Sequence, residues 1–206
     1  MNYKTPQEEF WAGKFGDKYI ERNIGEEYLA SNLSFFSKTF RQISKPTSLI
    51  EFGANVGMNL RAIKNLFPKI KLGGIEINKS ACKELSNFIG EENIFNGSIF
   101  DFKTVDKYEV SLIKCVLIHI NPEMLPVVYK KLYQTSSKYI LIAEYYNPSP
   151  VVVNYRGNED RLFKRDFAGE MLDKFDDLRL VDYGFIYKRD NSFPQDDVTW
   201  FLLEKF

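Results

Sequence analysis

Residues 48–60 read SLIEFGANVGMNL, and this stretch decides the fold. A short apolar run ends near Glu51, the chain turns through Gly53 and Gly57, and a segment with helical periodicity follows. A strand, a glycine turn and a helix in this order open a nucleotide-binding α/β fold. The sequence therefore predicts a Rossmann-like, mostly parallel sheet with a ligand site at the turn.

The residues of the turn discriminate between ligands. A dinucleotide site prefers G-x-G-x-x-G, because its second glycine lets the backbone approach a pyrophosphate. Asn55 stands in that place, and Glu51 just before the turn would repel a phosphate and attract an ammonium group. The pattern E-x-G-x-x-x-G therefore favours S-adenosylmethionine (SAM), which carries an amino group and a sulfonium but no phosphate. A tight turn that binds nothing is the alternative.

A second acidic residue strengthens the case for an adenosyl ligand. Glu76 ends the buried-strand pattern KLGGIE and follows Glu51 by 25 residues, which fits one strand–helix–strand unit. A carboxylate at the end of the second strand accepts hydrogen bonds from ribose hydroxyls. Alone, Glu76 would fit a solvated strand end equally well. Beside the glycine turn it indicates a ribose-containing ligand.

Composition restricts the class of protein. The 206 residues contain 28 Lys and Arg and 28 Asp and Glu, so the net charge is zero and a polynucleotide substrate is disfavoured. The two cysteines, Cys82 and Cys115, offer no metal spacing or disulfide framework and indicate a reducing compartment. We find no apolar signal segment and no run long enough to span a bilayer, so we expect a cytoplasmic protein without a metal.

Alternating helical and strand patterns run along the chain. We predict a packing helix over 26–43, strands at 47–52, 71–77, 93–97, 109–116 and 138–144, and a polar, proline-bearing connection over 147–165. A short helix over 166–175 is followed by strands at 178–188 and 197–205, which predict an antiparallel hairpin at the C-terminus. The expected organisation is one domain, with an N-terminal helical lid over 1–45 and an α/β core over 46–206.

The chain resembles the class I SAM-dependent methyltransferases, and among them the methylases associated with pseudaminic acid biosynthesis. The matching segments span nearly the whole sequence: TPQEEFWAG (5–13), IEFGANVG (50–57), KCVLIHINP (114–122), AEYYNP (143–148), YRG (155–157), KRDFAG (164–169) and DVTWFLLEK (197–205). The resemblance implies methyl transfer from SAM in a surface-polysaccharide or sugar pathway. One residue departs from the pattern, because Ser98 stands where the family usually has an acidic residue at the adenine edge.

The glycine turn, the strand ends and the resemblance together predict which residues hold the cofactor. Trp11 and Tyr19, with Phe15 and Arg22, would fold over the cofactor as a lid, although an amphipathic docking helix is an equal alternative. The full expected set is Trp11, Tyr19, Glu51, Gly53, Ala54, Asn55, Gly57, Glu76, Ile77, Ser98, Ile99 and Lys114.

The acceptor is expected at the same edge of the sheet. His119, the only histidine, follows the fourth core strand and is the candidate general base for a hydroxyl acceptor. Tyr145 and Tyr146 follow the fifth core strand and could stack on a sugar, or simply pack. Arg156 and Arg165 could grip an anionic group, unless neighbouring acidic residues neutralise them.

The sequence thus predicts a methyltransferase that acts on a small, anionic acceptor such as a sugar, a nucleotide sugar or a phosphorylated intermediate. A catalytically silent SAM-binding partner protein and a dinucleotide-dependent oxidoreductase are the alternatives. Neither the oligomeric state nor the choice between oxygen and nitrogen acceptors follows from the sequence.

Overall fold

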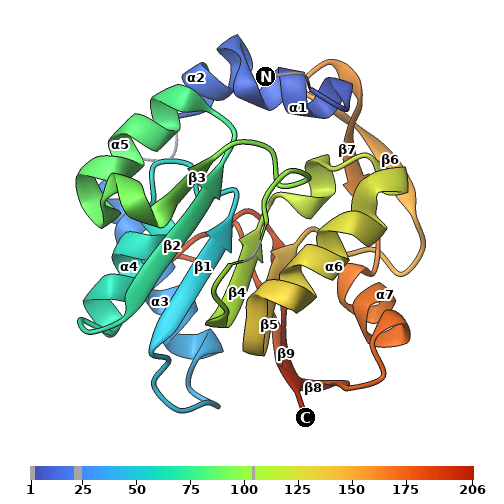
Figure 1. Ribbon diagram of the computed structural model, residues 1–206. Helices are drawn as coiled ribbons and strands as arrows, with labels where there is room; N and C mark the ends of the chain where they lie inside the picture. The colour runs from blue at the N-terminus through green and yellow to red at the C-terminus, as the bar shows by residue number, and fades with distance from the viewer. Residues whose placement is uncertain (1–2, 21–24, 104) are drawn as a thin grey trace.

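A computed structural model of the chain describes residues 3–20, 25–103 and 105–206, so the expected role of Arg22 falls outside the described residues. A central sheet lies between two layers of helices, and further helices and a small hairpin lie over one end of the sheet (Figure 1). This arrangement confirms the predicted Rossmann-like class I methyltransferase architecture, with a mostly parallel sheet and a C-terminal antiparallel hairpin.

The central sheet has seven strands in the order β3-β2-β1-β4-β5-β9-β8. Their bounds are β1 (Ser48–Phe52), β2 (Lys71–Glu76), β3 (Ile94–Asn96), β4 (Tyr108–Lys114), β5 (Ser136–Glu144), β8 (Leu178–Ile186) and β9 (Val198–Lys205). The pairs from β3 to β5 are parallel, while β9 pairs antiparallel with both β5 and β8. The chain moves outward from β1 in one direction and from β4 in the other, so the β1–β4 boundary is the topological switch point at which such sheets bind ligands.

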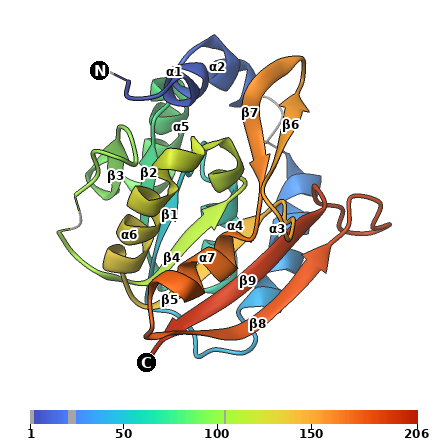
Figure 2. The same cartoon turned by 90° about the vertical axis from the view of Figure 1, so that its right-hand side faces the viewer.

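Two hydrophobic clusters hold helices on the two faces of this sheet. On one face, α3 (Glu26–Thr39), α4 (Met58–Leu66) and α5 (Lys79–Ile89) pack through residues such as Phe36, Ile63 and Leu85. On the other face, α6 (Leu125–Thr135) and α7 (Phe167–Lys174) pack through residues such as Leu132 and Met171. Figure 2 shows the two layers from the side. Helix α3, which the sequence prediction placed in the lid, is thus part of a sheet-covering layer.

The lid at the carboxyl ends of the parallel strands has two components. Helices α1 (Pro6–Ala12) and α2 (Lys14–Ile20) lie across the top of the sheet in Figure 1. Beside them stands an antiparallel hairpin of β6 (Val151–Tyr155) and β7 (Asn158–Lys164). The prediction of a polar connection over 147–165 was therefore wrong: the apolar run Val151-Val152-Val153 and the turn at Gly157 form a hairpin.

Shorter differences occur at the ends of elements. Helix α3 ends at Thr39 rather than at 43, and β5 begins at Ser136 rather than at 138. Single-turn 3-10 helices occur at η1 (Glu91–Asn93), η2 (Leu117–His119) and η3 (Pro122–Met124), the last of which precedes α6. Over the described residues, no helix combines the length and apolar character needed to cross a membrane. The division of the chain at residue 45 stays a prediction.

Candidate functional site

A cavity lies at the carboxyl ends of β1, β2 and β4, beneath α1 and α2. Its walls come from the loops that follow these strands, from the loop after β3, and from the N-terminal helices. The described residues with charged side chains in the lining are three carboxylates, Glu8, Glu76 and Asp196, and one ammonium, Lys114. The cavity therefore has an acidic balance.

The glycine loop after β1 forms a close-fitting floor of the cavity. Gly53 has a φ of 80° and Gly57 a φ of 81°, a left-handed conformation that side-chain-bearing residues rarely adopt. A Cβ atom added at Gly53 would lie 2.5 Å from a methyl carbon of Val116. The amides of Gly53 and Ala54 both donate to the carbonyl oxygen of Ile75, at 2.8 and 3.0 Å, which ties the loop to β2.

Glu76 joins the loops after β1 and β2. One carboxylate oxygen accepts a hydrogen bond from the Asn55 amide at 2.7 Å, and the other accepts from the Asn78 amide at 2.7 Å. Burial raises the pKa of Glu76, and these two amides act in the opposite sense. Because each carboxylate oxygen has two lone pairs, each can still accept a hydrogen bond from a ligand hydroxyl.

A buried carboxyl group, Glu51, and a buried ammonium group, Lys114, interact electrostatically beside the loop, and Lys114 lines the cavity. Glu51 accepts a hydrogen bond from Asn59 at 2.6 Å, its second oxygen is buried with no partner in the described part of the chain, and burial raises its pKa to about 8. Burial opposes the charge on Lys114, but the anionic groups around it, Glu51 and Asp196 among them, more than offset this effect and raise its pKa. The pair could hold the ammonium and carboxylate ends of an amino acid.

His119 closes the side of the cavity beyond β4. Its Nδ1 lies 2.6 Å from the backbone oxygen of Arg161 on β7, and its ring lies between those of Trp11 and Tyr155, with centroids 4.7 and 4.9 Å away. Burial lowers the pKa of His119 to about 4. The imidazole is therefore neutral at physiological pH and has a lone pair for a proton, but it is a weaker base than an exposed histidine.

Aromatic packing joins the two components of the lid. The rings of Phe10 and Phe15 stack with centroids 4.1 Å apart, and Phe15 meets Tyr155 of β6 edge-on at 6.1 Å. The Gln7 amide nitrogen donates to the backbone oxygen of Asp160 on β7 at 3.0 Å. The N-terminal helices and the hairpin therefore form one continuous cover.

Most of the residues that the sequence predicted for the cofactor line the cavity. Glu51 and Gly57 lie outside its lining, behind the loop. The predicted residues that line the cavity are Trp11, Tyr19, Gly53, Ala54, Asn55, Glu76, Ile77, Ser98, Ile99 and Lys114, together with His119.

The four predicted acceptor-binding residues do not line this cavity. Tyr145 lies near Lys164, with the ammonium 5.3 Å from the ring centroid, and Arg156 is exposed at the turn of the β6–β7 hairpin. Tyr146 and Arg165 line a separate small recess, and the Arg165 Nε lies 2.5 Å from a carboxylate oxygen of Glu170. Their role toward an acceptor stays a prediction.

Several lining residues were not foreseen. Asn78 caps α5 through the amide of Ala81 and also donates to Asp17, at 2.9 Å in both cases. Glu8 lies in the first turn of α1 and forms a capping box with the N-cap residue Thr5, a T-x-x-E pattern that is visible in the sequence. No local signal indicated Asp196, because only the folded β8–β9 connection brings it to the cavity. The remaining unforeseen polar and aromatic lining residues include Gln7, Tyr28 and Asn59.

The fold and the position of the cavity define the class I methyltransferase architecture, and comparison with solved structures agrees. Mitomycin 7-O-methyltransferase MmcR superposes with a TM-score of 0.68 at 13% identity, covering 98% of this chain and 61% of its own. Magnesium protoporphyrin IX methyltransferase ChlM from Synechocystis, with bound SAM, superposes with a TM-score of 0.67 at 10% identity over 100% of both chains.

The plantazolicin methyltransferase BpumL, in complex with SAH, superposes with a TM-score of 0.64 at 16% identity, covering 97% of this chain and 93% of its own. No protein-family model matches the chain, and no significant match to a curated protein sequence is found. The structural similarities show that the chain has the class I methyltransferase fold.

Proposed function

We propose that the protein is an enzyme that binds SAM in this cavity and transfers its methyl group to a small molecule. The observation that carries this proposal is the charge of the cavity, where three carboxylates and one ammonium line the walls among the described residues. An acidic cavity suits a sulfonium cation and opposes the diphosphate of a dinucleotide. Solved structures with the same fold contain SAM or SAH, which agrees with this choice.

The residues present fit such a cofactor. Buried side-chain oxygens of Glu51, Asn55 and Asn59 have no hydrogen-bond partner among the described residues, and these residues lie in β1, the glycine loop and the first turn of α4. Unpartnered buried polar atoms are rare, so they indicate a donor supplied by a ligand. We propose that Glu51 and Lys114 hold the amino acid end and that Glu76 holds the ribose hydroxyls.

When bound, SAM supplies an electrophilic methyl group on a positively charged sulfur. The protein's own contribution is alignment, because holding two reactants in a productive geometry removes most of the entropy cost of their encounter. The cover made by α1, α2 and β6–β7 would exclude water from the cavity. His119 would take the proton from a hydroxyl acceptor through Nε2, since Nδ1 is engaged with the backbone oxygen of Arg161.

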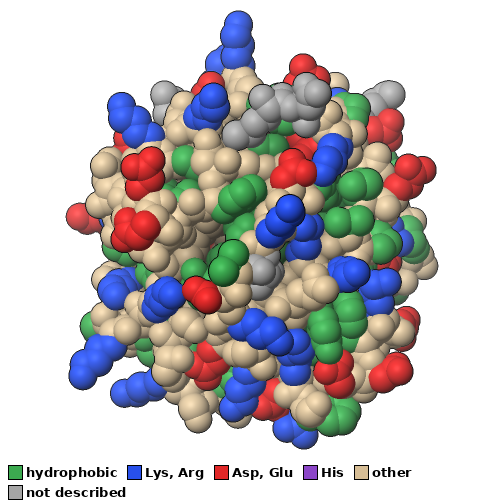
Figure 3. All heavy atoms as spheres, viewed as in Figure 1, with side chains coloured by type: hydrophobic (Ala, Val, Ile, Leu, Met, Phe, Trp, Pro, Cys, Tyr) green, Lys and Arg blue, Asp and Glu red, His purple; other side chains and the backbone are tan. Residues whose placement is uncertain are grey.

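We further infer that the acceptor is a small anionic molecule, such as a sugar, a nucleotide sugar or a phosphorylated intermediate of cytoplasmic surface-polysaccharide or capsule biosynthesis. The resemblance to pseudaminic acid-associated methylases supports this placement. Arg156, at the turn of the β6–β7 hairpin, and Arg165, just after β7, lie outside the cavity lining, and we infer that one of them contacts the anionic group. Basic and acidic side chains are interspersed on the face shown in Figure 3, which favours a small acceptor over a polynucleotide.

Calorimetry with S-adenosylhomocysteine (SAH) and with NAD tests the cofactor. We expect SAH to bind and NAD to give no heat of binding, because the lining opposes a diphosphate. Tight binding of NAD without a response to SAH would contradict the proposal and favour an oxidoreductase. A screen of sugar, nucleotide-sugar and phosphorylated acceptors for SAH production then tests catalysis, and SAH binding without turnover on any acceptor would favour a silent partner protein.

A further inference from the structure

Glu8 carries a buried oxygen atom that has no hydrogen-bond partner among the residues that the structure describes. Its side chain lines the cavity, and the residue is only 7% exposed. One carboxylate oxygen accepts from the Lys4 amide at 2.6 Å and from the Thr5 amide at 2.9 Å. The other, Oε1, is buried and accepts no hydrogen bond from residues 3–20, 25–103 or 105–206. Leaving a buried acceptor unpaired is costly, so this oxygen indicates a hydrogen-bond donor on a ligand.

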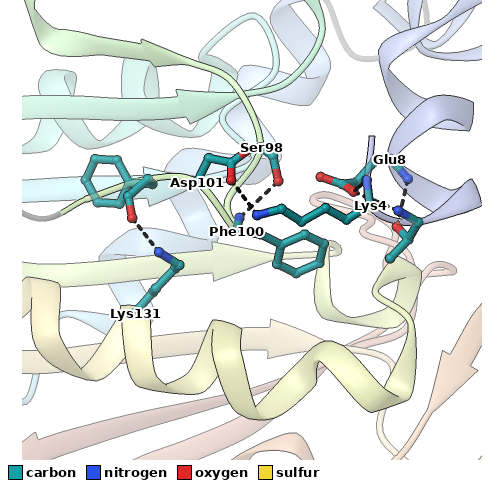
Figure 4. A network of polar contacts seen from close by, with 8 residues as sticks. Lys4, Glu8, Ser98, Phe100, Asp101 and Lys131 are labelled. Atoms are coloured by element: carbon teal, nitrogen blue, oxygen red, sulfur yellow. Dashed lines mark hydrogen bonds and ion pairs between the residues drawn. The ribbon is translucent and has the colours of Figure 1, made fainter. Parts of the chain in front are cut away.

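Ser98 lies across the cavity from Glu8 and offers the complementary group. Its oxygen accepts a hydrogen bond from the Phe100 amide at 3.0 Å, and its hydroxyl hydrogen is left to donate. Figure 4 shows the end of the Glu8 side chain directed toward Ser98. Both residues line the cavity, and both are 7% exposed. Together they present one acceptor and one donor at the same end of the cavity.

With the ribose at Glu76, as proposed above, the base of an adenosyl ligand would lie at this end of the cavity. From Glu76 the lining continues along Ile77, Ile99 and Phe100, which are apolar and suit a flat ring. Glu8 and Ser98 lie at the end of these apolar walls. Adenine carries an exocyclic amino donor next to a ring-nitrogen acceptor, and this pair matches one acceptor beside one donor.

We propose that Glu8 and Ser98 together read the adenine edge: Glu8 Oε1 accepts a hydrogen bond from the exocyclic amino group, and the Ser98 hydroxyl donates to the neighbouring ring nitrogen. The inference rests on the proposed function, because it assumes an adenosyl ligand. Ser98 stands where an acidic residue is usual at the adenine edge. We assign that carboxylate contact instead to Glu8, which lies in the N-terminal helix α1.

The cover is built to hold Glu8 in this position. Thr5 and Glu8 form a reciprocal capping box at the start of α1. The Lys4 ammonium pairs with the carboxylate of Asp101 in the loop that follows Ser98, as the network in Figure 4 shows. The residues that would contact the base and the residues that fix the start of α1 over the cavity are therefore neighbours in one network.

The substitution Glu8→Gln tests this contact with little change in shape. A glutamine at this position still fits a capping box. Its amide oxygen would stay on the Lys4 and Thr5 amides, so its amide nitrogen would face the adenine amino group, donor against donor. We expect SAH to bind about 10- to 100-fold more weakly than to the wild type.

The analogue S-inosylhomocysteine makes the test specific, because its base carries a carbonyl oxygen beside an N–H group. The Glu8→Gln variant should accept this reversed pattern, so the preference for SAH over the inosyl analogue should fall by at least about tenfold. The matched control is Glu9→Gln, which removes the same charge from an exposed residue of α1 that does not line the cavity. It should retain the wild-type affinities for both ligands.

The outcomes separate the two proposals. Suppose that the wild type and Glu9→Gln bind SAH, and that Glu8→Gln either lowers the affinities for SAH and the inosyl analogue equally or leaves both unchanged. The adenine contact is then wrong, and the proposed function stands. If the wild type binds no SAH, both fail. Should Glu8→Gln not fold, the contact is tested on the wild type with an SAH analogue that carries two methyl groups on the exocyclic nitrogen. This analogue lacks the N–H donor. Equal binding of that analogue and SAH would overturn the contact, and weaker binding would support it.

Discussion

The imidazole Nδ1 of His119 and the backbone oxygen of Arg161 lie 2.6 Å apart. A carbonyl oxygen can only accept, so Nδ1 carries the hydrogen, and a neutral ring then has its free lone pair on Nε2. Since burial lowers the pKa of His119 to about 4, the ring stays neutral throughout the physiological range. The hairpin thus fixes the tautomer that a general base requires.

His119→Ala should lower turnover by roughly 10²- to 10⁴-fold while leaving SAH affinity nearly intact, because proton transfer is lost and the cofactor contacts are not. The wild-type rate should show no titration near pH 6.5, since the folded-state pKa lies well below that value. Steady-state rates between pH 5 and 9 and calorimetry test this. Full activity of the variant across neutral pH would contradict a general base and favour an amine acceptor that deprotonates in solution.

Glu51 should make the unliganded protein less stable as the pH rises. Burial raises its folded-state pKa to about 8 from 4.5, so between these values the folded state binds more protons than the unfolded state. The free energy of unfolding therefore falls with rising pH in this window, by up to about 1.4 kcal/mol per pH unit.

Glu51→Gln should remove this part of the pH dependence and raise the stability of the unliganded protein at pH 7. Its amide oxygen can still accept the hydrogen bond from Asn59. Denaturant unfolding at pH 5, 6, 7 and 8 measures the difference between the two proteins. Parallel stability curves would show that Glu51 does not titrate in this window.

Glu76→Ala should weaken SAH binding by about 2–3 kcal/mol, since two hydrogen bonds to a charged acceptor are lost. Glu84→Ala, on the exposed side of α5, is the control and should leave the affinity unchanged. Because Glu76 also holds the amides of Asn55 and Asn78, thermal unfolding of the unliganded variant is measured in parallel. An unchanged affinity would place the ribose elsewhere.

Gly53→Ala should destabilise the protein more than Gly157→Ala, although both glycines have left-handed φ values of 80° and 81°. At Gly157 an added Cβ meets nothing within 4 Å, so only backbone strain of about 1 kcal/mol is expected. At Gly53 the same Cβ lies 2.5 Å from Val116, and overpacking adds about 1–3 kcal/mol. Denaturant midpoints compare the two variants, and equal losses would mean that Val116 moves aside freely.

Arg156→Ala and Arg165→Ala should each raise the Michaelis constant of an anionic acceptor more than they lower turnover, because uniform binding is lost. Added salt should weaken acceptor binding in the same way through screening. Arg179→Ala is the control, since Arg179 pairs with Glu204 at 2.7 Å on the edge strand and does not line the cavity. Unchanged constants in the first two variants would exclude their role in gripping the acceptor.

The sequence predicted the sheet and much of the cavity because those signals are local. The turn at Gly53 and Gly57, the strand ending at Glu76 and the C-terminal hairpin pattern each occupy a few consecutive residues. Parallel strands bring their carboxyl ends to one edge, so residues after β1, β2 and β4 meet there whatever the details of packing.

The residues that the sequence missed depend on contacts between distant segments. The β6–β7 hairpin had its own pattern in Val151–Tyr155, but flanking prolines and charges favoured a loop. Asp196 and Glu8 reach the cavity from opposite ends of the chain. The side chain of Arg165 turns toward Glu170 instead of the cavity, a direction that spacing alone cannot give.

The bond between Gln7 and Asp160 joins residues 153 positions apart. A nascent chain emerges N-terminal end first, and domains assemble as their contacts become available. The helix α1 is therefore synthesised before the hairpin that it contacts, and this bond can form only after β7 has been made. The two parts of the cover therefore cannot join before residues 158–164 have been added, and the cavity wall at Asp196 is made later still.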